Sequence, residues 1–273
     1  MKKTVAMLIL CAGILAAQDG GEKVTVPLRD PARPARIQAH LLAGGIIVRG
    51  ADVKDVIVEA RSRSRVEPRE GREPRADGMK RLELPGNAGL DVVEDDNVVK
   101  IRTASWRRPT DLVITVPRHS SLELKCTNDG DISVEQVEGE IDANDLNGKV
   151  TLKNVAGSVV AHSLNGEVTV SLDRVDPSKP MSFSTLNGNI DVTLPPDVKA
   201  SIRVKTDNGD IYSDFDVALN NQPSVTVSDE SGKQKDGTYH VRYDRTVRGT
   251  INGGGPEYQF TSFNGQIYIR KRK

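Results

Sequence analysis

Apolar and polar residues alternate in short runs between regularly spaced glycines from residue 130 onward. Glycine recurs at 130, 139, 148, 157 and 166, and the intervening segments follow Gly-x-[Ile/Val]-x-apolar-x-x-[Val/Leu]-x, as in "GDISVEQVE". Strict alternation is typical of β-strands that bury one side. A fixed period indicates one small structural unit stacked on copies of itself. The pattern therefore predicts a repeat architecture built from short strands.

Two nine-residue steps form one coil of this repeat. "LNG" recurs at 146–148, 164–166 and 186–188, and "DNG" at 207–209, which gives coils of 18–22 residues. The second corner is "EG" (138–139) or "AG" (156–157), or a proline-bearing segment at 175–180 and 194–199. Asn-Gly and Asp-Gly tolerate the positive φ of a sharp corner. We predict an all-β, elongated β-solenoid; an antiparallel β-meander or sandwich is the alternative, because Asn-Gly also favours hairpins.

The alternation also predicts which side chains point inward. Stacking of the coils at ~4.8 Å should place Asn147, Asn165 and Asn187 above one another as an amide ladder. The intervening Ser, Glu, Lys, Thr and Asp positions should face solvent. The predicted core consists of the aliphatic positions Ile132, Val134, Val137, Ile141, Leu146, Val150, Leu152, Val155, Val159, Leu164, Val168 and Val170.

The flanks resemble irregular copies of the same unit. Segment 111–134 echoes 189–213, since both read strand, proline corner, strand, Asx-Gly. Segment 44–64 alternates similarly and could form the first coil or two, and 249–271 supplies one more strand–Asn-Gly–strand unit at the far end. The basic tail 270–273 should discourage pairing of an exposed terminal strand there.

The N-terminal residues are typical of an export signal. A basic head at Lys2 and Lys3 precedes a short apolar stretch, and small residues at Ala16 and Ala17 suit cleavage there. We expect a signal peptide at 1–17, an extended lead-in at 18–39 and a single β-repeat domain at 40–273 with a charged loop at 61–81. Cys11 follows aliphatic residues, but Leu10 stands where a lipoprotein site takes a small residue. We expect no transmembrane segment in the mature chain, because no later stretch has the ~20 apolar residues required.

The amino-acid composition argues against several classes of function. Lys+Arg and Asp+Glu number 38 each, so no overall charge favours a nucleic acid partner. Cys126 is the only cysteine after residue 17, which rules out an intramolecular disulfide or a cysteine metal site in the mature chain. We expect it to be a small buried residue. Aromatic residues amount to only 4%, fewer than a carbohydrate-binding cleft usually needs.

The chemical signatures of catalysis and metal binding are weak. Calcium-binding β-rolls repeat an aspartate at each turn, whereas the residues after the spaced glycines are Asp131, Glu140, Lys149, Ser158 and Glu167. Carboxylates such as Asp131, Glu140 and Glu167 could stack, but nothing gathers them with His and Arg around a substrate. The histidines at 40, 119, 162 and 240 share no metal-ligand spacing. We therefore expect no catalytic, cofactor-binding or metal-binding residues.

The "LNG" coils, the echoing "ITVP…TNDGDISV" and "VTLP…TDNGDIYS" segments and the closing "INGGGPEYQFTSFNGQIYIRK" together resemble a bacterial family. It is the putative-adhesin family with β-strand repeats, of the DUF4097 type. The resemblance covers roughly residues 40–271 and implies an exported, all-β envelope protein with no established activity and no catalytic residues to transfer.

From these patterns we expect a non-enzymatic protein of the periplasm or cell surface. It would act as a binding, adhesin-like or scaffolding element, with an unknown envelope protein or surface polymer as its partner. Two alternatives remain open. One is a carbohydrate-active lyase or hydrolase on a β-helix, and the other is a regulatory binding partner in envelope stress.

Overall fold

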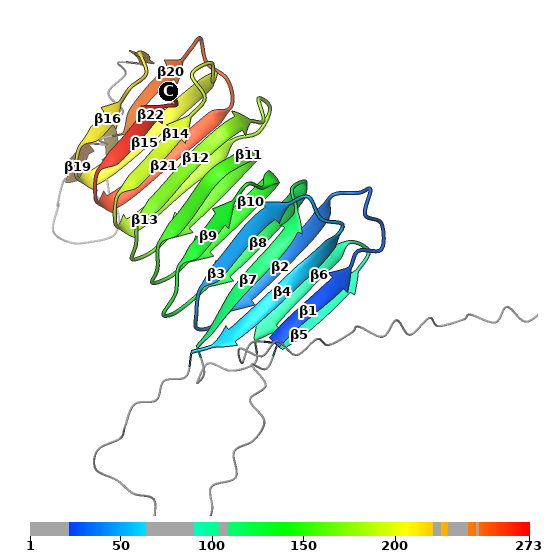
Figure 1. Cartoon of the computed structure of the whole chain (residues 1–273). Helices are drawn as coiled ribbons and strands as arrows, with labels where there is room; N and C mark the ends of the chain where they lie inside the picture. The colour runs from blue at the N-terminus through cyan, green and yellow to red at the C-terminus, as the bar shows by residue number, and fades with distance from the viewer. Residues whose placement is uncertain (1–21, 64–89, 104–108, 221–224, 229–239, 244–245) are drawn as a thin grey trace, which may run out of the picture.

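The computed structural model describes residues 22–63, 90–103, 109–220, 225–228, 240–243 and 246–273. All regular elements in these ranges are β-strands, arranged as an elongated, twisted stack (Figure 1). The predicted all-β solenoid is confirmed. The parallel register between successive coils excludes the meander: Ile141 of β10 pairs with Val159 of β11, for example, in a parallel ladder.

The stack has two faces joined at corners. Neighbouring strands on the first face are, in order, β5 (Leu90–Asp95), β6 (Val98–Thr103), β2 (Ala35–Leu41), β8 (Ser120–Cys126), β10 (Glu138–Asp145), the second half of β11 (Val150–Ser163), β13 (Met181–Asn187), β21 (Glu257–Asn264), β15 (Ala200–Asn208), β20 (Val247–Ile251) and β17 (Val217–Leu219).

The second face follows the same order of chain segments. Its strands are β1 (Glu22–Pro27), β4 (Asp55–Ser62), β7 (Thr110–Pro117), β3 (Ile46–Ala51), β9 (Ile132–Glu135), the first half of β11, β12 (Val168–Val175), β14 (Ile190–Leu194), β22 (Ile267–Lys271) and β16 (Ile211–Ser213). A separate antiparallel pair is formed by β18 (Val225–Ser228) and β19 (His240–Tyr243).

One strand of each face, with the corner between them, forms a unit that we call a rung. Along the axis the rungs are 98–103 with 110–117, then 35–51, 120–135, 138–153, 156–175, 181–194, 257–271 and 200–213. Two rungs are therefore out of chain order. In Figure 1 the red β22 lies between β14 and β16, far from its neighbours in sequence.

The two echoing segments explain this insertion. The chain passes from β7 to β8 at 117–120 and from β14 to β15 at 194–200, and each passage steps over one rung position. Rung 35–51 fills the first gap and rung 257–271 fills the second. The expectation that 249–271 ends the stack is therefore wrong. β22 is paired on both sides, so the basic tail does not protect a terminal strand.

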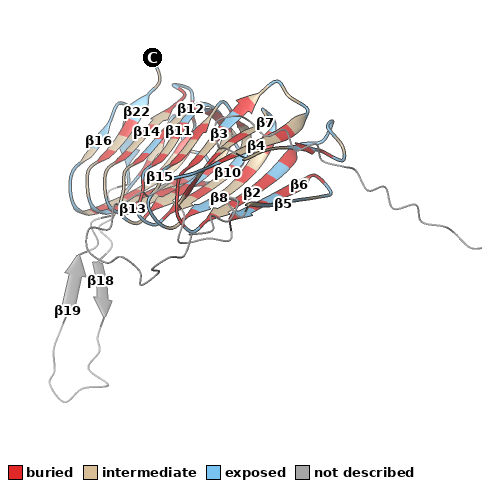
Figure 2. Cartoon of the chain, turned by 60° about the horizontal axis from the view of Figure 1, so that its bottom comes forward, coloured by how far each residue is buried: buried red, intermediate tan, exposed pale blue. Residues whose placement is uncertain are grey.

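The core lies between the faces, and buried positions alternate with outward ones along the strands (Figure 2). Of the predicted core residues, ten are buried as expected, including Ile132, Leu152 and Val170. Phe183 and Phe260 stack inside on adjacent rungs with ring centroids 5.1 Å apart. Leu146 and Leu164 were wrongly predicted. Leu146 is exposed and Leu164 is half-buried, because both follow the last inward residue of their strand.

The glycine of each "LNG" corner is required by close packing rather than by positive φ. A Cβ on Gly148 would come within 2.0 Å of the Gly130 carbonyl oxygen on the preceding rung, and one on Gly166 within 2.1 Å of the Gly148 oxygen. Neither glycine has positive φ. The prediction of a φ-driven glycine is therefore wrong at these corners. The second corners do use the left-handed region, at Gln136 (φ 58°) and Asn154 (φ 50°).

Several expectations fall outside the described residues. The signal peptide at 1–17, the possible lipidation of Cys11 and residues 64–81 of the charged loop belong to this group. Residues 61 and 62, at the start of that loop, belong to β4. Within the segment expected as a lead-in, residues 22–27 form β1, and β2 begins at Ala35.

Candidate functional site

The corner that carries the "LNG" motif is the most regular surface of the stack. Its inward column consists of polar residues and one cysteine, which take one position per rung: Cys126, Asp145, Ser163, Thr185, Ser262 and Thr206. Asp145 and Ser163 were expected to face solvent, and that expectation is wrong because both are buried. Alternation from Ile141 through Ala143 carries Asp145 inward, whatever its polarity.

The hydroxyls and the thiol of this column satisfy the corner carbonyls. Ser163 Oγ donates to the Gly148 oxygen at 2.8 Å, and Thr185 Oγ1 to the Gly166 oxygen at 2.8 Å. Ser262 and Thr206 repeat the contact with Gly188 (3.1 Å) and Gly265 (2.9 Å). The Cys126 thiol donates to the Gly44 oxygen at 2.8 Å. Each buried donor therefore joins its rung to the adjacent rung. These contacts also give the buried donors the hydrogen-bond partners that buried polar groups need.

Asp145 is the exception in this column. Its Oδ1 accepts from the Asn147 amide at 3.0 Å, but its buried Oδ2 has no hydrogen-bond partner among the described residues. Burial raises the pKa of the Asp145 carboxyl from 3.8 to about 6. Hydrogen bonds from backbone amides favour the ionised form and only partly oppose this rise. The neighbouring Cys126 thiol has its pKa raised to about 12, chiefly by burial and then by the charge of Asp145.

The outer side of the corner carries the predicted amide ladder, which is confirmed and longer than expected. Asn165 Nδ2 donates to Asn147 Oδ1 at 3.0 Å, and Asn187 Nδ2 to Asn165 Oδ1 at 2.8 Å. Asn264 then donates to Asn187 at 2.7 Å, and Asn208 to Asn264 at 2.8 Å. At the other end Asn147 Nδ2 donates to Asn128 Oδ1 at 3.1 Å. The ladder follows the spatial order of the rungs.

Next to the ladder lies a row of apolar side chains that we call the corner ridge: Leu146, Leu164, Leu186 and Phe263. They occupy neighbouring rungs, since Leu186 and Phe263 lie between the paired positions of β13 and β21. Leu146 and Leu186 are each 40% exposed and Phe263 is 46% exposed. The two flanking columns are uncharged on the last three of these rungs. They hold His162, Ser184 and Thr261 on one side and the asparagines on the other.

The contribution of the ridge to folding stability does not explain why its side chains are apolar and exposed. A buried leucine contributes roughly 1.5–3 kcal/mol through removal from water, and a side chain that stays two-fifths exposed gives up part of that contribution. Contiguous exposed apolar surface next to an uncharged polar row is typical of interaction sites. The ridge is therefore the candidate functional surface. Sequence reasoning missed it because the recurring leucine was assigned to the core by its hydrophobicity.

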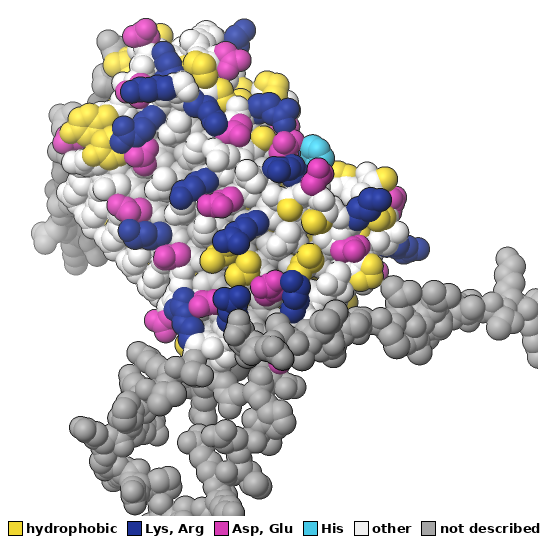
Figure 3. Space-filling view, viewed as in Figure 1, with side chains coloured by type: hydrophobic (Ala, Val, Ile, Leu, Met, Phe, Trp, Pro, Cys, Tyr) yellow, Lys and Arg dark blue, Asp and Glu magenta, His cyan; other side chains and the backbone are white. Residues whose placement is uncertain are grey.

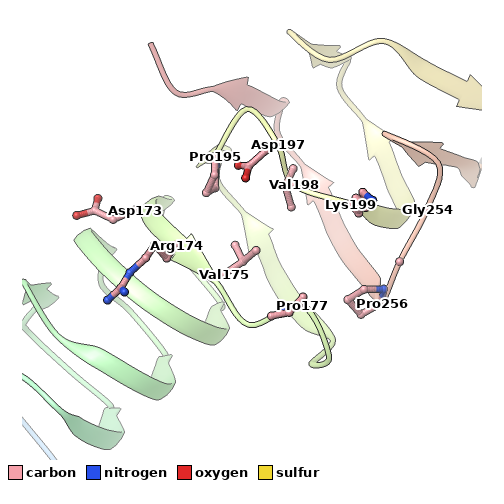
Figure 4. A pocket seen from close by; sticks show the side chains of 11 residues that line it. Asp173, Arg174, Val175, Pro177, Pro195, Asp197, Val198, Lys199, Gly254 and Pro256 are labelled. Carbon is pink, nitrogen blue, oxygen red and sulfur yellow. The ribbon is translucent and has the colours of Figure 1, made fainter.

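A hollow with a volume of about 540 Å³ lies at the opposite corner. Three irregular loops frame it: 175–180, 194–199 and the turn that ends at Pro256 (Figure 4). Two of its charged neighbours are engaged elsewhere: Arg174 points away and pairs with Glu138 at 2.8 Å, and Asp173 pairs with Arg272. Asp197 and Lys199 also line the hollow, beside Pro177 and Pro195. The lining holds no serine, cysteine or histidine, so it offers no hydroxyl or thiol nucleophile paired with an imidazole base.

The structure separates the residues that were weighed as metal or catalytic candidates. Asp131, Lys149 and Glu167 stack at one corner, where Lys149 Nζ contacts Glu167 at 3.0 Å and the Lys149 amide donates to Asp131 at 2.8 Å. Glu140 lies at the other corner, paired with Lys179. In the described ranges no group of three or more His, Cys, Asp or Glu is placed to hold a metal ion.

The histidines with described side chains serve separate contacts. His162 Nδ1 lies 2.8 Å from Ser184 Oγ, and His119 Nδ1 lies 3.4 Å from Glu138. His40 lies 3.8 Å from Glu123, and burial lowers its pKa. Over the described part of the chain, no helix is long and apolar enough to span a membrane.

Comparison with solved structures finds two matches of low identity. One is described as a putative cell adhesion protein from Clostridium sporogenes, with a TM-score of 0.44 and 10% identity over 92% of this chain and 100% of that one. The other is a putative adhesin from Bacteroides fragilis, with a TM-score of 0.31 and 11% identity over 93% of this chain and 98% of that one. The search of curated proteins finds no match.

The family model described as Toastrack DUF4097 matches residues 111–252, more than half of the 273 residues. The match spans the "LNG" corners and the two echoing segments on which the resemblance was argued, but only the first residues of the closing segment 249–271. The chain belongs to the Toastrack DUF4097 family.

Proposed function

We propose that this chain is an exported protein of the bacterial envelope or cell surface that acts by binding, as an adhesin-like or scaffolding element, without turnover. The single observation that supports this function is the corner ridge. Leu146, Leu164, Leu186 and Phe263 form a continuous apolar row on adjacent rungs, held rigid by the amide ladder beside it. A preorganised surface loses little conformational entropy on binding.

The partner of the ridge is an envelope protein or surface polymer that presents a complementary uncharged strip. The flanking columns hold no Lys, Arg, Asp or Glu at positions 162, 184 and 261, so hydrophobic contact and hydrogen bonds to amides and hydroxyls would dominate. The stacked rungs repeat this surface at ~4.8 Å steps, which suits an extended partner.

The decisive experiment measures saturable binding of fluorescently labelled mature protein to intact cells of the producing bacterium. A double variant, Leu186→Glu with Phe263→Glu, places two charges on the ridge and should reduce cell binding at least tenfold. The matched control, Thr169→Glu with Thr193→Glu, adds the same charges to outward positions of β12 and β14. Equal binding by the two double variants would remove the ridge as the functional surface.

Export and the absence of turnover are tested separately. Protease added to intact cells should degrade the protein if it lies on the surface and spare it if it lies in the periplasm. Purified protein should release no reducing ends or unsaturated sugars from envelope polysaccharides. Release that disappears on replacement of one specific Asp or Glu would support the carbohydrate-active alternative instead.

A further inference from the structure

The last rung of the parallel stack, 200–213, is covered on only one of its two faces. On the first face β20 and then β17 pair antiparallel beyond β15. On the second face β16 pairs with β22 and with no other described strand. At the opposite end both halves of the outermost rung are covered, by β5 and by β4 with β1. Among the described strands, β16 is therefore a parallel edge strand without a cap.

The free edge of β16 presents backbone groups that can bond another strand. The Asp214 amide donates to the Ile269 oxygen at 2.9 Å, and the Asp210 oxygen accepts from the Ile267 amide at 3.0 Å. These contacts direct the even-numbered residues toward β22. In a parallel ladder the intervening residues, Ile211 and Ser213, direct their N–H and C=O groups to the other side. Such an edge is a template for strand addition.

Tyr212 places an aromatic ring at the same edge. It stacks on Tyr268 with centroids 5.2 Å apart and an interplanar angle of 12°. The Arg270 guanidinium lies 5.0 Å from the Tyr268 ring centroid, so a cation already sits on this aromatic pair. Tyr212 is 48% exposed, and Figure 3 shows a hydrophobic group over β16 and β22. Because β16 pairs only with β22 among the described strands, no strand paired with β16 covers the ring face opposite Tyr268.

The chain segment that carries this ring is acidic, although Arg270 and Lys271 of the neighbouring strand β22 lie close by. Residues 206–219 include Asp207, Asp210, Asp214 and Asp216 but no lysine or arginine. None of these four carboxylates takes part in a described side-chain ion pair, although Asp214 Oδ2 accepts from the Lys271 backbone amide at 3.3 Å. Asp210 lies 3.4 Å from the Tyr212 hydroxyl. A cationic partner would meet both the ring face and these carboxylates, of which Asp214 is partly offset by Arg270.

We propose that the β16 edge binds an extended, basic segment of a partner protein as an added strand, with a lysine or arginine side chain over Tyr212. The backbone of Ile211 and Ser213 supplies the hydrogen bonds, and the aspartates select for positive charge. This site is distinct from the corner ridge and does not depend on the function proposed for it.

The test uses fluorescence anisotropy with the mature chain and a labelled peptide of alternating valine and lysine, eight residues long. The matching valine–glutamate peptide is the control ligand. We expect the lysine peptide to bind and the glutamate peptide not to bind. Tyr212→Ala should weaken binding roughly three- to thirtyfold, the range expected for the loss of a cation–π contact. Thr151→Ala, on the same face but far along the stack, should leave it unchanged.

Two further variants separate the contributions. Asp210→Asn with Asp214→Asn should weaken binding and reduce its dependence on salt. Ser213→Pro removes one backbone N–H of the free edge and should therefore also weaken binding. Thermal melting of this variant checks that the fold is retained. Equal binding of the two peptides, or binding insensitive to Tyr212→Ala, would overturn the proposal. So would a wild-type dimer in light scattering that Tyr212→Ala converts to monomer, because the edge would then pair with a second copy of the chain.

Discussion

Ser163 Oγ donates a buried hydrogen bond of 2.8 Å to the carbonyl oxygen of Gly148, on the preceding rung. One rung earlier, Asp145 occupies the position of Ser163, and Gly130 occupies that of Gly148. A Cβ added to Gly148 would come within 2.0 Å of the Gly130 oxygen and 2.8 Å of Asp145 Oδ2, so the two oxygens face the same small space. A protonated Asp145 can donate there as Ser163 does, and an ionised one cannot.

This relationship predicts that stability depends on the protonation of Asp145. Burial raises its pKa from 3.8 to about 6, so the folded state binds the proton more tightly than the unfolded state. Its contribution is fully present below about pH 4 and is lost as the pH rises through about 6. Relative to Asp145→Asn, which does not titrate, wild type should lose about 2–3 kcal/mol of unfolding free energy across this range.

Urea unfolding of wild type, Asp145→Asn and Asp145→Ser at several pH values measures the difference. Both variants keep a side-chain donor and should exceed wild type in stability above about pH 7. A difference that stays constant with pH would show that Asp145 does not change its protonation in this window.

The second prediction contrasts a core leucine with a ridge leucine. Leu152→Ala should reduce the free energy of unfolding by about 2–5 kcal/mol, because Leu152 is fully buried and leaves a cavity. Leu186→Ala removes the same atoms from a half-exposed position and should cost less than about 1 kcal/mol. Denaturant unfolding of the two variants measures both losses of unfolding free energy. Equal losses would mean that the ridge is part of the core.

The third prediction concerns the corner glycines. Gly148→Ala places a Cβ against backbone on the preceding rung, and backbone cannot move without separating the rungs, so we expect a loss of several kcal/mol, about 3 or more. Gly253→Ala is the control. Gly253 has a φ of 86° but nothing within 4 Å of an added Cβ, so it should cost only the backbone strain, about 1–2 kcal/mol. Thermal melts that rank Gly253→Ala as the more damaging change would contradict the close-packing argument.

The fourth prediction concerns the thiol of Cys126. The residue is 4% exposed and its pKa is raised to about 12, so almost no thiolate forms at pH 8. A chain that lacks residues 1–17 should therefore resist labelling by a disulfide-exchange reagent when folded and react fully in denaturant. Rapid labelling of the folded protein would show that the corner opens.

The repeat of the coil could be predicted from sequence because each rung makes the same contacts with its neighbours. Alternation located most of the core, and the recurring asparagine predicted the ladder, since identical residues at identical corners must stack. The functional surface could not be predicted in the same way. Leu146 and Leu164 were assigned by hydrophobicity, although alternation from Ile141 places Asp145 inside and Leu146 outside.

The order of the rungs was decided only by the tertiary structure. Local pattern cannot distinguish one parallel neighbour from another, because every rung offers a similar aliphatic edge. The placement of 35–51 beside 120–135, and of 257–271 between 181–194 and 200–213, depends on which gaps the two proline passages leave open. The sequence by itself determined the period, the alternation and the corner chemistry, which are local properties. Tertiary packing determined the inserted rungs, the exposed corner ridge and the uncapped β16 edge, because each depends on contacts between segments far apart in the chain.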